Sequence, residues 1–198
     1  MGALLVGDVS AFAVTPPEVL TVGETMAMLA PARAEPLTEA VEFRVDAGGA
    51  ESNVAGHLAA LGIQARWHSR LGDDAVGDRV LRQLASRGID VSTVVRDETR
   101  PTGLYVKDPG SAVRYYRAGS AASAFGVDDA AGADLAGIRL LHVSGITAAL
   151  SVAAAAFLNA LITRARDDGV TVSFDVNHRP ALWSASAAAQ PYQVLPLP

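Results

Sequence analysis

Residues 47–62 read AGGAESNVAGHLAALG, and residues 70–77 read RLGDDAVG. The glycine pair Gly48-Gly49 carries no side chains and leads directly into a sequence that favours a helix. Backbone N–H groups at the start of that helix, together with the amide of Asn53, are therefore free to meet a polar ligand. A simple turn between a strand and a capped helix explains the glycine pair about equally well. The spacing between the two segments favours a ligand site, because ordinary loops do not reproduce it.

Length and charge limit the kinds of protein that this chain can be. It has 198 residues, no cysteine and a formal net charge of −5, and this length suits one domain with a substantial core. No run of Lys or Arg is present to displace counterions from phosphates, so we expect no nucleic-acid partner. The apolar start lacks Lys and Arg before Arg33 and is interrupted by Asp8, which argues against a secretory signal. The apolar segment 148–163 is too short to cross a bilayer, so we expect no membrane partner and a cytoplasmic location.

Strand patterns and helix patterns alternate along the chain. Strands alternating with helices predict βαβ units, and therefore an α/β fold with a parallel sheet. The capping chemistry of Asp73 or Asp74 fits the start of one helix, and Gly88 fits its end. The expected strands cover 19–29, 65–71, 138–143 and 170–175, and the expected helices cover 52–61, 74–87 and 151–168.

Two half-polar segments do not belong in a buried parallel sheet. Residues 41–46 alternate between apolar and charged side chains, as in a strand with one solvent-exposed face. Residues 102–117 contain two alternating stretches separated by Asp108-Pro109-Gly110, which is strong turn chemistry and predicts a hairpin. We expect these segments to form a small, partly exposed β-lid.

The predicted hairpin carries side chains that suit an acidic sugar. Tyr105 lies on one strand, and Tyr115 shares a face of the other strand with Arg117. Tyrosine offers an apolar ring with a hydroxyl, and arginine offers a rigid fork for a carboxylate. Cross-strand aromatic pairs also commonly do no more than stabilise a hairpin.

Polar residues follow the last predicted strand directly. The segment Asp175-Val176-Asn177-His178-Arg179 lies where open α/β sheets place their ligands, beyond the carboxyl end of a strand. Asp175 and Asn177 would also serve simply to satisfy loop backbone groups. We expect no metal site, because the earlier His142 has no second histidine at metal-ligand spacing and suits the interior of a sheet.

Together these motifs resemble the N-terminal part of the ribokinase-like (PfkB) carbohydrate kinases, and most of all the 2-keto-3-deoxygluconate kinase branch. The resemblance rests on the glycine-rich segment, on Gly103-Leu104-Tyr105, on Tyr115-Tyr116-Arg117 and on the D-x-N-x-R pattern of residues 175–179. It implies a ribokinase-like parallel sheet with helices on both faces plus the β-lid. It also implies transfer of the ATP γ-phosphate, with Mg²⁺, to a hydroxyl of a sugar acid.

The resemblance further implies roles for individual residues. Asn177 and Arg179 would lie near the cofactor phosphates. The residues that would bind the substrate are Gly48, Gly49, Ala50, Glu51, Asn53, Tyr105, Tyr115, Arg117 and Arg179.

The resemblance extends from about Val19 to Trp183 and does not include the family's catalytic Gly-Ala-Gly-Asp. Gly132-Ala133-Asp134 imitates the end of that motif but lies before the strand at 138–143, so we assign it no catalytic role. We therefore expect a truncated chain that lacks the base aspartate and the C-terminal part of the fold, and that is inactive alone. The expected organisation is a poorly ordered extension over 1–18, a partial kinase domain over 19–189 and an irregular tail over 190–198.

Two alternatives remain open at this point. One is a kinase for another sugar, such as fructose or ribose, although Arg117 and Arg179 favour a carboxylate. The other is a non-catalytic module that binds a sugar or forms a homodimer or larger homo-oligomer through its lid strands.

Overall fold

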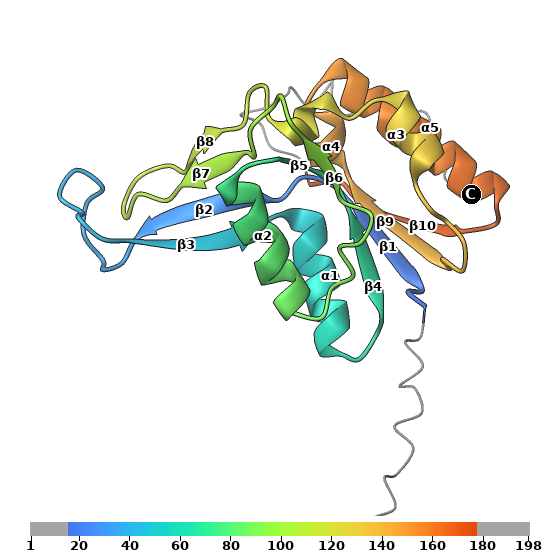
Figure 1. Ribbon diagram of the computed structural model, residues 1–198, viewed down its shortest axis with the longest axis horizontal. Helices are drawn as coiled ribbons and strands as arrows, with labels where there is room; N and C mark the ends of the chain where they lie inside the picture. The colour runs from blue at the N-terminus through green and yellow to red at the C-terminus, as the bar shows by residue number, and fades with distance from the viewer. Residues whose placement is uncertain (1–15, 178–198) are drawn as a thin grey trace, which may run out of the picture.

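The central layer of the molecule is a parallel β-sheet. The computed structural model describes residues 16–177, and its main sheet has the strand order β10-β9-β1-β4, with every neighbouring pair parallel (Figure 1). These strands are β1 (Val19–Val22), β4 (Ala65–His68), β9 (Leu140–Ser144) and β10 (Thr171–Asp175). The chain leaves β1 for β4 on one side and reaches β9 on the other, so the carboxyl ends of β1 and β9 mark the switch point of this open sheet.

Helices cover both faces of the sheet, as the family resemblance implies. The helices α1 (Ala50–Ala60) and α2 (Ala75–Ser86) lie on one face, and α3 (Val127–Gly132) and α5 (Val152–Asp167) lie on the other (Figure 1). The period-2 geometry of β1 divides its side chains between two buried clusters. Val19 packs with the α1 and α2 side, whereas Leu20 and Val22 pack with the α3 and α5 side.

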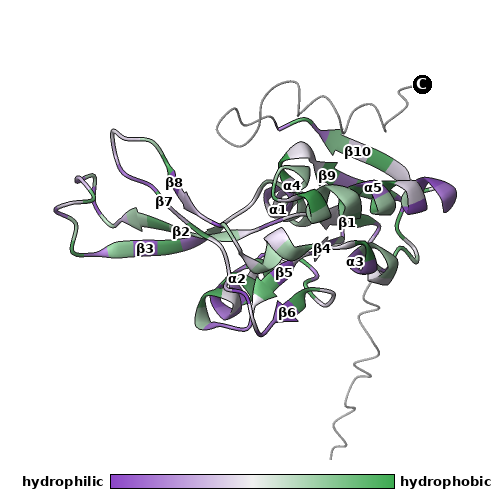
Figure 2. Cartoon of the chain, turned by 90° about the horizontal axis from the view of Figure 1, so that it is seen from above, coloured by the Kyte–Doolittle hydropathy of each residue, from purple (hydrophilic) through white to green (hydrophobic). Residues whose placement is uncertain are grey.

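A second sheet extends away from this body and forms the predicted lid. Its strand order is β3-β2-β7-β8, with β2 parallel to β7 and the other two pairs antiparallel. Figures 1 and 2, which are at right angles, both show the sheet projecting to one side of the parallel layer. The strands are β2 (Met26–Pro31), β3 (Phe43–Gly48), β7 (Leu104–Val106) and β8 (Arg114–Tyr116).

The prediction of a single buried strand over 19–29 is wrong. The chain leaves the parallel sheet after Val22 and enters the lid at Met26, so one apolar run supplies strands to two different sheets. Gly23 lies at the break, where a Cβ atom would come 2.1 Å from the carboxyl carbon of Glu51. Only a residue without a side chain therefore fits this crossing.

The predicted strand over 65–71 also divides in two. After β4, the chain continues as β5 (Arg70–Gly72), which pairs in parallel with β6 (Val95–Asp97) in a small separate sheet. The predicted strand at 41–46 lies at 43–48 instead. It has no well-buried face, because five of its six residues are exposed or only partly buried.

The predicted ends of α2 and of α5 (Val152–Asp167) and the predicted hairpin are confirmed, whereas α1 begins at Ala50, two residues before the predicted start. Asp74 precedes α2, and its side chain accepts a hydrogen bond from the Gly77 N–H at 2.7 Å. Ser151 caps α5 in the same way through the Ala154 N–H. The hairpin pairs Tyr105 with Tyr115 in the β7–β8 register. The remaining short elements are η1 (Ala121–Ala124) and α4 (Gly145–Ala148).

Candidate functional site

The candidate site lies at the carboxyl edge of the parallel sheet, below the lid. Gly23 and Glu24 follow β1, Ser144 ends β9, and Asn177 lies two residues beyond the end of β10. Because Asp175 pairs with Ser144 in the β9–β10 register, these polar residues share one edge of the sheet. This edge is the switch point, where open α/β sheets bind ligands.

The predicted glycine pair connects the lid to the sheet body. Gly48 is the last residue of β3, and Gly49 is the N-cap of α1 with no side-chain capping bond. A Cβ atom on Gly48 would lie 2.2 Å from the Tyr105 hydroxyl, so the glycine allows that hydroxyl to approach the backbone. The structure thus brings Gly48, Gly49, Ala50 and Tyr105 together.

Two predicted tyrosines and one arginine also come together. The rings of Tyr105 and Tyr115 have centroids 5.7 Å apart and are tilted by 35°. The guanidinium carbon of Arg117 lies 5.8 Å from the centre of the Tyr115 ring, within the range of a cation–π contact. Partial burial raises the pKa of Tyr105, with Tyr115 and Asp46 adding to the effect, so its hydroxyl stays protonated as a donor at neutral pH.

A buried ion pair holds Arg117, and the sequence analysis did not anticipate it. The guanidinium Nη2 pairs with Glu24 Oε2, and the two side chains are only 9% and 2% exposed. Ser120 Oγ donates a hydrogen bond to the other oxygen of Glu24 at 2.6 Å. Nε and Nη1 of Arg117 are buried, and no residue that the structure describes accepts from them. The sequence signal was an acidic residue inside an apolar run.

The structure does not support a direct contact between Glu51 and sugar hydroxyls. Glu51 is fully buried, and its Oε1 accepts hydrogen bonds from the Ser144 and Thr147 hydroxyls, the latter at 3.0 Å. Burial raises the pKa of its carboxyl group to about 7, although both hydroxyls and the positive charge of Arg117 lower it. Glu51 therefore connects α1, β9 and α4 beneath the site through Oε1, whereas its buried Oε2 has no hydrogen-bond partner among the described residues.

Two other predicted residues lie apart from the tyrosines and Arg117. Asn53 is exposed and lines a depression of about 390 Å³ with His57, Arg87 and two small residues of α1. Asn177 has a left-handed backbone (φ 39°), and its N–H donates to Asp175 Oδ1 at 3.0 Å. Both Arg179, predicted to bind substrate and phosphate, and His178 lie outside the described residues.

The structural roles expected for several polar residues are confirmed. Asp74 caps α2, as described above, and also accepts from the Thr102 N–H at 2.8 Å. Asp134, to which we assign no catalytic role, forms an ion pair with Arg66 at 2.8 Å. His142 lies within β9, and its Nδ1 is 3.0 Å from the Ser173 hydroxyl. Within residues 16–177, no three His, Cys, Asp or Glu side chains gather as a set of metal ligands.

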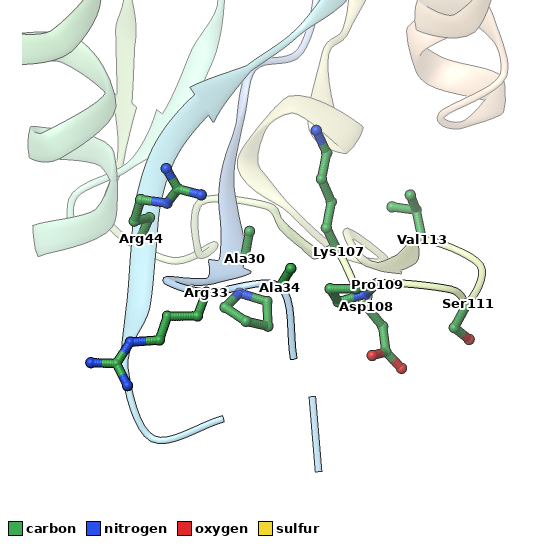
Figure 3. Close-up of a pocket in the computed structure, with 10 residues that line it drawn as sticks. Ala30, Arg33, Ala34, Arg44, Lys107, Asp108, Pro109, Ser111 and Val113 are labelled. Carbon is green, nitrogen blue, oxygen red and sulfur yellow. The ribbon is translucent and has the colours of Figure 1, made fainter. Parts of the chain in front are cut away.

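A separate pocket of about 420 Å³ lies in the outer part of the lid (Figure 3). Arg44 of β3 and Arg33 border one side, and Lys107 and Val113 of the hairpin border the other. The remaining lining residues are Ala30, Pro31, Ala34, Asp108, Pro109 and Ser111. None of the predicted sugar-binding residues lines this pocket, so it is distinct from the site at the sheet edge.

A parallel sheet with helices on both faces, together with a β-lid over its carboxyl edge, defines a ribokinase-like fold. The chain belongs to the pfkB family of carbohydrate kinases, because the family described as "pfkB family carbohydrate kinase" matches residues 16–198. It is similar to the 2-dehydro-3-deoxygluconokinase of Bacillus subtilis (strain 168), with 39% identity over 175 residues. It is also similar to the 2-dehydro-3-deoxygalactonokinase of Haloferax volcanii, with 35% identity over 176 residues.

Solved structures give the same family and fold. A PfkB protein from Polaromonas sp. JS666 is 39% identical and superposes with a TM-score of 0.82 over 90% of this chain and 62% of its own. The 2-dehydro-3-deoxygluconokinase from Thermotoga maritima is 32% identical, with a TM-score of 0.84 over 90% of this chain and 56% of its own. The two curated relatives named above are matched over 86% of this chain and over 54% and 55% of their own lengths. The chain thus spans about half the length of those relatives. None of the helices in the described residues is long and apolar enough to cross a membrane.

Proposed function

We propose that this chain is the sugar-binding part of an ATP-dependent kinase for 2-keto-3-deoxygluconate, the compound also called 2-dehydro-3-deoxygluconate. The observation that carries the proposal is Arg117, a buried guanidinium with N–H groups that no described residue accepts, beside the Tyr105–Tyr115 pair. A buried donor without an acceptor is costly, and a carboxylate supplied by a ligand would offset that cost. The names of the relatives with 32–39% identity support the same class of substrate.

The sugar acid would lie between the lid and the sheet edge. Arg117 would receive the carboxylate, and the hydroxyls of Tyr105 and Tyr115 would meet the sugar hydroxyls. Gly48 and Gly49 would let the ligand approach the backbone at the start of α1. Arg179 remains a predicted second contact for the acid.

ATP and Mg²⁺ remain part of the proposal for the kinase reaction. ATP would supply the transferred phosphoryl group, and Mg²⁺ would offset the charge that develops on it. Asn177, one of the two residues expected near the phosphates, follows β10 at the carboxyl edge of the parallel sheet, on a left-handed turn. The resemblance assigns the catalytic base to a Gly-Ala-Gly-Asp segment, which this sequence does not contain. We therefore expect the 198-residue chain to bind the sugar acid without turning it over.

Calorimetric titration of the 198-residue chain with 2-keto-3-deoxygluconate tests the binding proposal. Arg117→Lys keeps the charge but loses the planar fork, so affinity should fall about tenfold or more. Arg114→Lys on β8, the strand just before Arg117, is the matched control, because Arg114 is exposed and its replacement should leave affinity unchanged. Equal binding by all three proteins would refute the role of Arg117, and no binding by the unaltered chain would refute the proposed substrate. Release of ADP from Mg-ATP by this chain would refute the absence of a base.

The two alternatives make different predictions in the same titration. A kinase for fructose or ribose would bind the neutral sugar more tightly than the acid. A non-catalytic module would bind a sugar, yet neither this chain nor a longer form of the protein would form ADP.

A further inference from the structure

The buried partner of Arg117 comes from a different part of the fold. Arg117 follows lid strand β8, whereas Glu24 follows β1 of the parallel sheet. Their ion pair therefore joins the lid to the sheet at the site itself. A guanidinium removed from water in this way needs an opposite charge nearby, and Glu24 supplies it.

Glu24 is itself held by Ser120, and Gly103 leaves room for its carboxylate. Its Oε1 accepts a hydrogen bond from Ser120 Oγ at 2.6 Å, which leaves Oε2 for Arg117. A Cβ atom on Gly103 would come 2.7 Å from the same Oε1, so the glycine makes room for the carboxylate. Oε1 is hydrogen-bonded, Oε2 has the ion pair with Arg117 but no hydrogen bond, and only 2% of the side chain is exposed, so Glu24 holds the guanidinium through Oε2.

We propose that Glu24 is a positioning residue, which with Ser120 fixes the Arg117 fork so that its remaining N–H groups meet the carboxylate of the sugar acid. This inference rests on the proposed function for its ligand. The observation behind it is that Glu24 pairs with only one nitrogen of Arg117, Nη2. The other two, Nε and Nη1, have no acceptor among the described residues. An arginine side chain left unheld would have to be ordered by the ligand, which weakens binding.

Removing the charge of Glu24 distinguishes positioning from a pure charge effect, because the two predict opposite changes in the affinity for the acid. If Glu24 only neutralised Arg117, then removing its negative charge would strengthen the binding of an anion. If Glu24 positions the fork, then Glu24→Gln should weaken binding of 2-keto-3-deoxygluconate about three- to tenfold. Ser120→Ala provides a second test, because it keeps every charge and removes the hydroxyl that holds Glu24, together with the 3.3 Å hydrogen bond that this hydroxyl accepts from the Ser123 N–H at the start of η1. It should weaken binding in the same direction and by less.

The Arg117 side chain can also be observed without any ligand. In the ¹⁵N NMR spectrum of the unaltered chain, its Nε–H signal should exchange slowly with water, and Arg117→Lys assigns that signal by removing it. Glu24→Gln should accelerate the exchange at least tenfold, and circular dichroism shows whether each variant is folded. Slow exchange retained in folded Glu24→Gln, or tighter binding of the acid by either variant, would overturn the inference. Absence of sugar binding by the unaltered chain would count against the proposed function instead, because the exchange measurement still reports on Glu24.

Discussion

Replacing Glu51 by glutamine should change how the stability of the protein depends on pH. The side chain is fully buried, and its Oε1 accepts hydrogen bonds from the Ser144 and Thr147 hydroxyls. Burial raises the pKa of this carboxyl from 4.5 to about 7 in the folded chain. A neutral glutamine amide has the same shape as the protonated acid, and its oxygen can accept both hydrogen bonds. The variant therefore copies the protonated form and cannot ionise.

The sign and size of the effect follow from linkage. Because the folded pKa lies above the unfolded one, the stabilisation is fully present below pH 4.5 and is lost as the pH rises through 7. At about 1.4 kcal/mol per pH unit, the total loss is roughly 3 kcal/mol, of which about 2 kcal/mol falls between pH 5.5 and pH 8.

Urea unfolding of both proteins at pH 5.5, 7 and 8 measures the difference. Buried His68 and half-buried His142 have lowered pKa values, so their contributions to stability change in the opposite direction over part of this range. They are common to both proteins and cancel when the two free energies of unfolding are subtracted at each pH. The variant should become more stable relative to the unaltered chain as the pH rises. Parallel pH profiles for the two proteins would refute a raised pKa at Glu51.

Three further predictions concern stability and assembly. Asp74→Ala should lower the free energy of unfolding by about 2–3 kcal/mol, because the backbone N–H groups of Gly77 and Thr102 lose their acceptor; chemical denaturation measures this, and a loss under 0.5 kcal/mol would contradict it. Leu161→Ala in α5 should cost about 2–5 kcal/mol, since the side chain is fully buried between that helix and the sheet; Leu61→Ala, at an exposed position, is the control in the same assay. If the lid forms a homodimer, then Tyr116→Lys on the exposed edge strand β8 should shift the protein toward monomer in a sedimentation experiment. If the chain without the substitution is already a monomer, this interface is ruled out.

Local chemistry made part of this fold predictable from the sequence. The Asp108-Pro109-Gly110 turn fixed the hairpin, and the structure confirms it with Gly110 in a left-handed conformation (φ 82°). The cap at Asp74 needed only the carboxylate and the helix pattern after it. The split of the run 19–29 between two sheets was not predictable in this way, because an apolar run carries no information about which sheet each half joins.

The charged contacts at the site could not be predicted from local sequence patterns either. Glu24 and Arg117 are far apart in the sequence, and only the meeting of lid and sheet makes them partners. Glu51 lies inside the glycine-rich motif, so its position suggested a ligand contact. Its burial depends on Ser144 at the end of a distant strand. Patterns of local periodicity cannot show such long-range pairs.

The buried charges also bear on which sugar would bind. Glu24 and Arg117 cancel each other, and Glu51 is protonated below about pH 7, so the described part of the site carries little net charge before a ligand arrives. In the proposed function, selectivity for an acid then comes from the N–H groups of Arg117 that still need acceptors, rather than from a positive field. A neutral sugar would offer those buried donors only hydroxyl oxygens, and a hydrogen bond to a carboxylate is roughly twice as strong as one to a neutral acceptor, so the acid would be preferred.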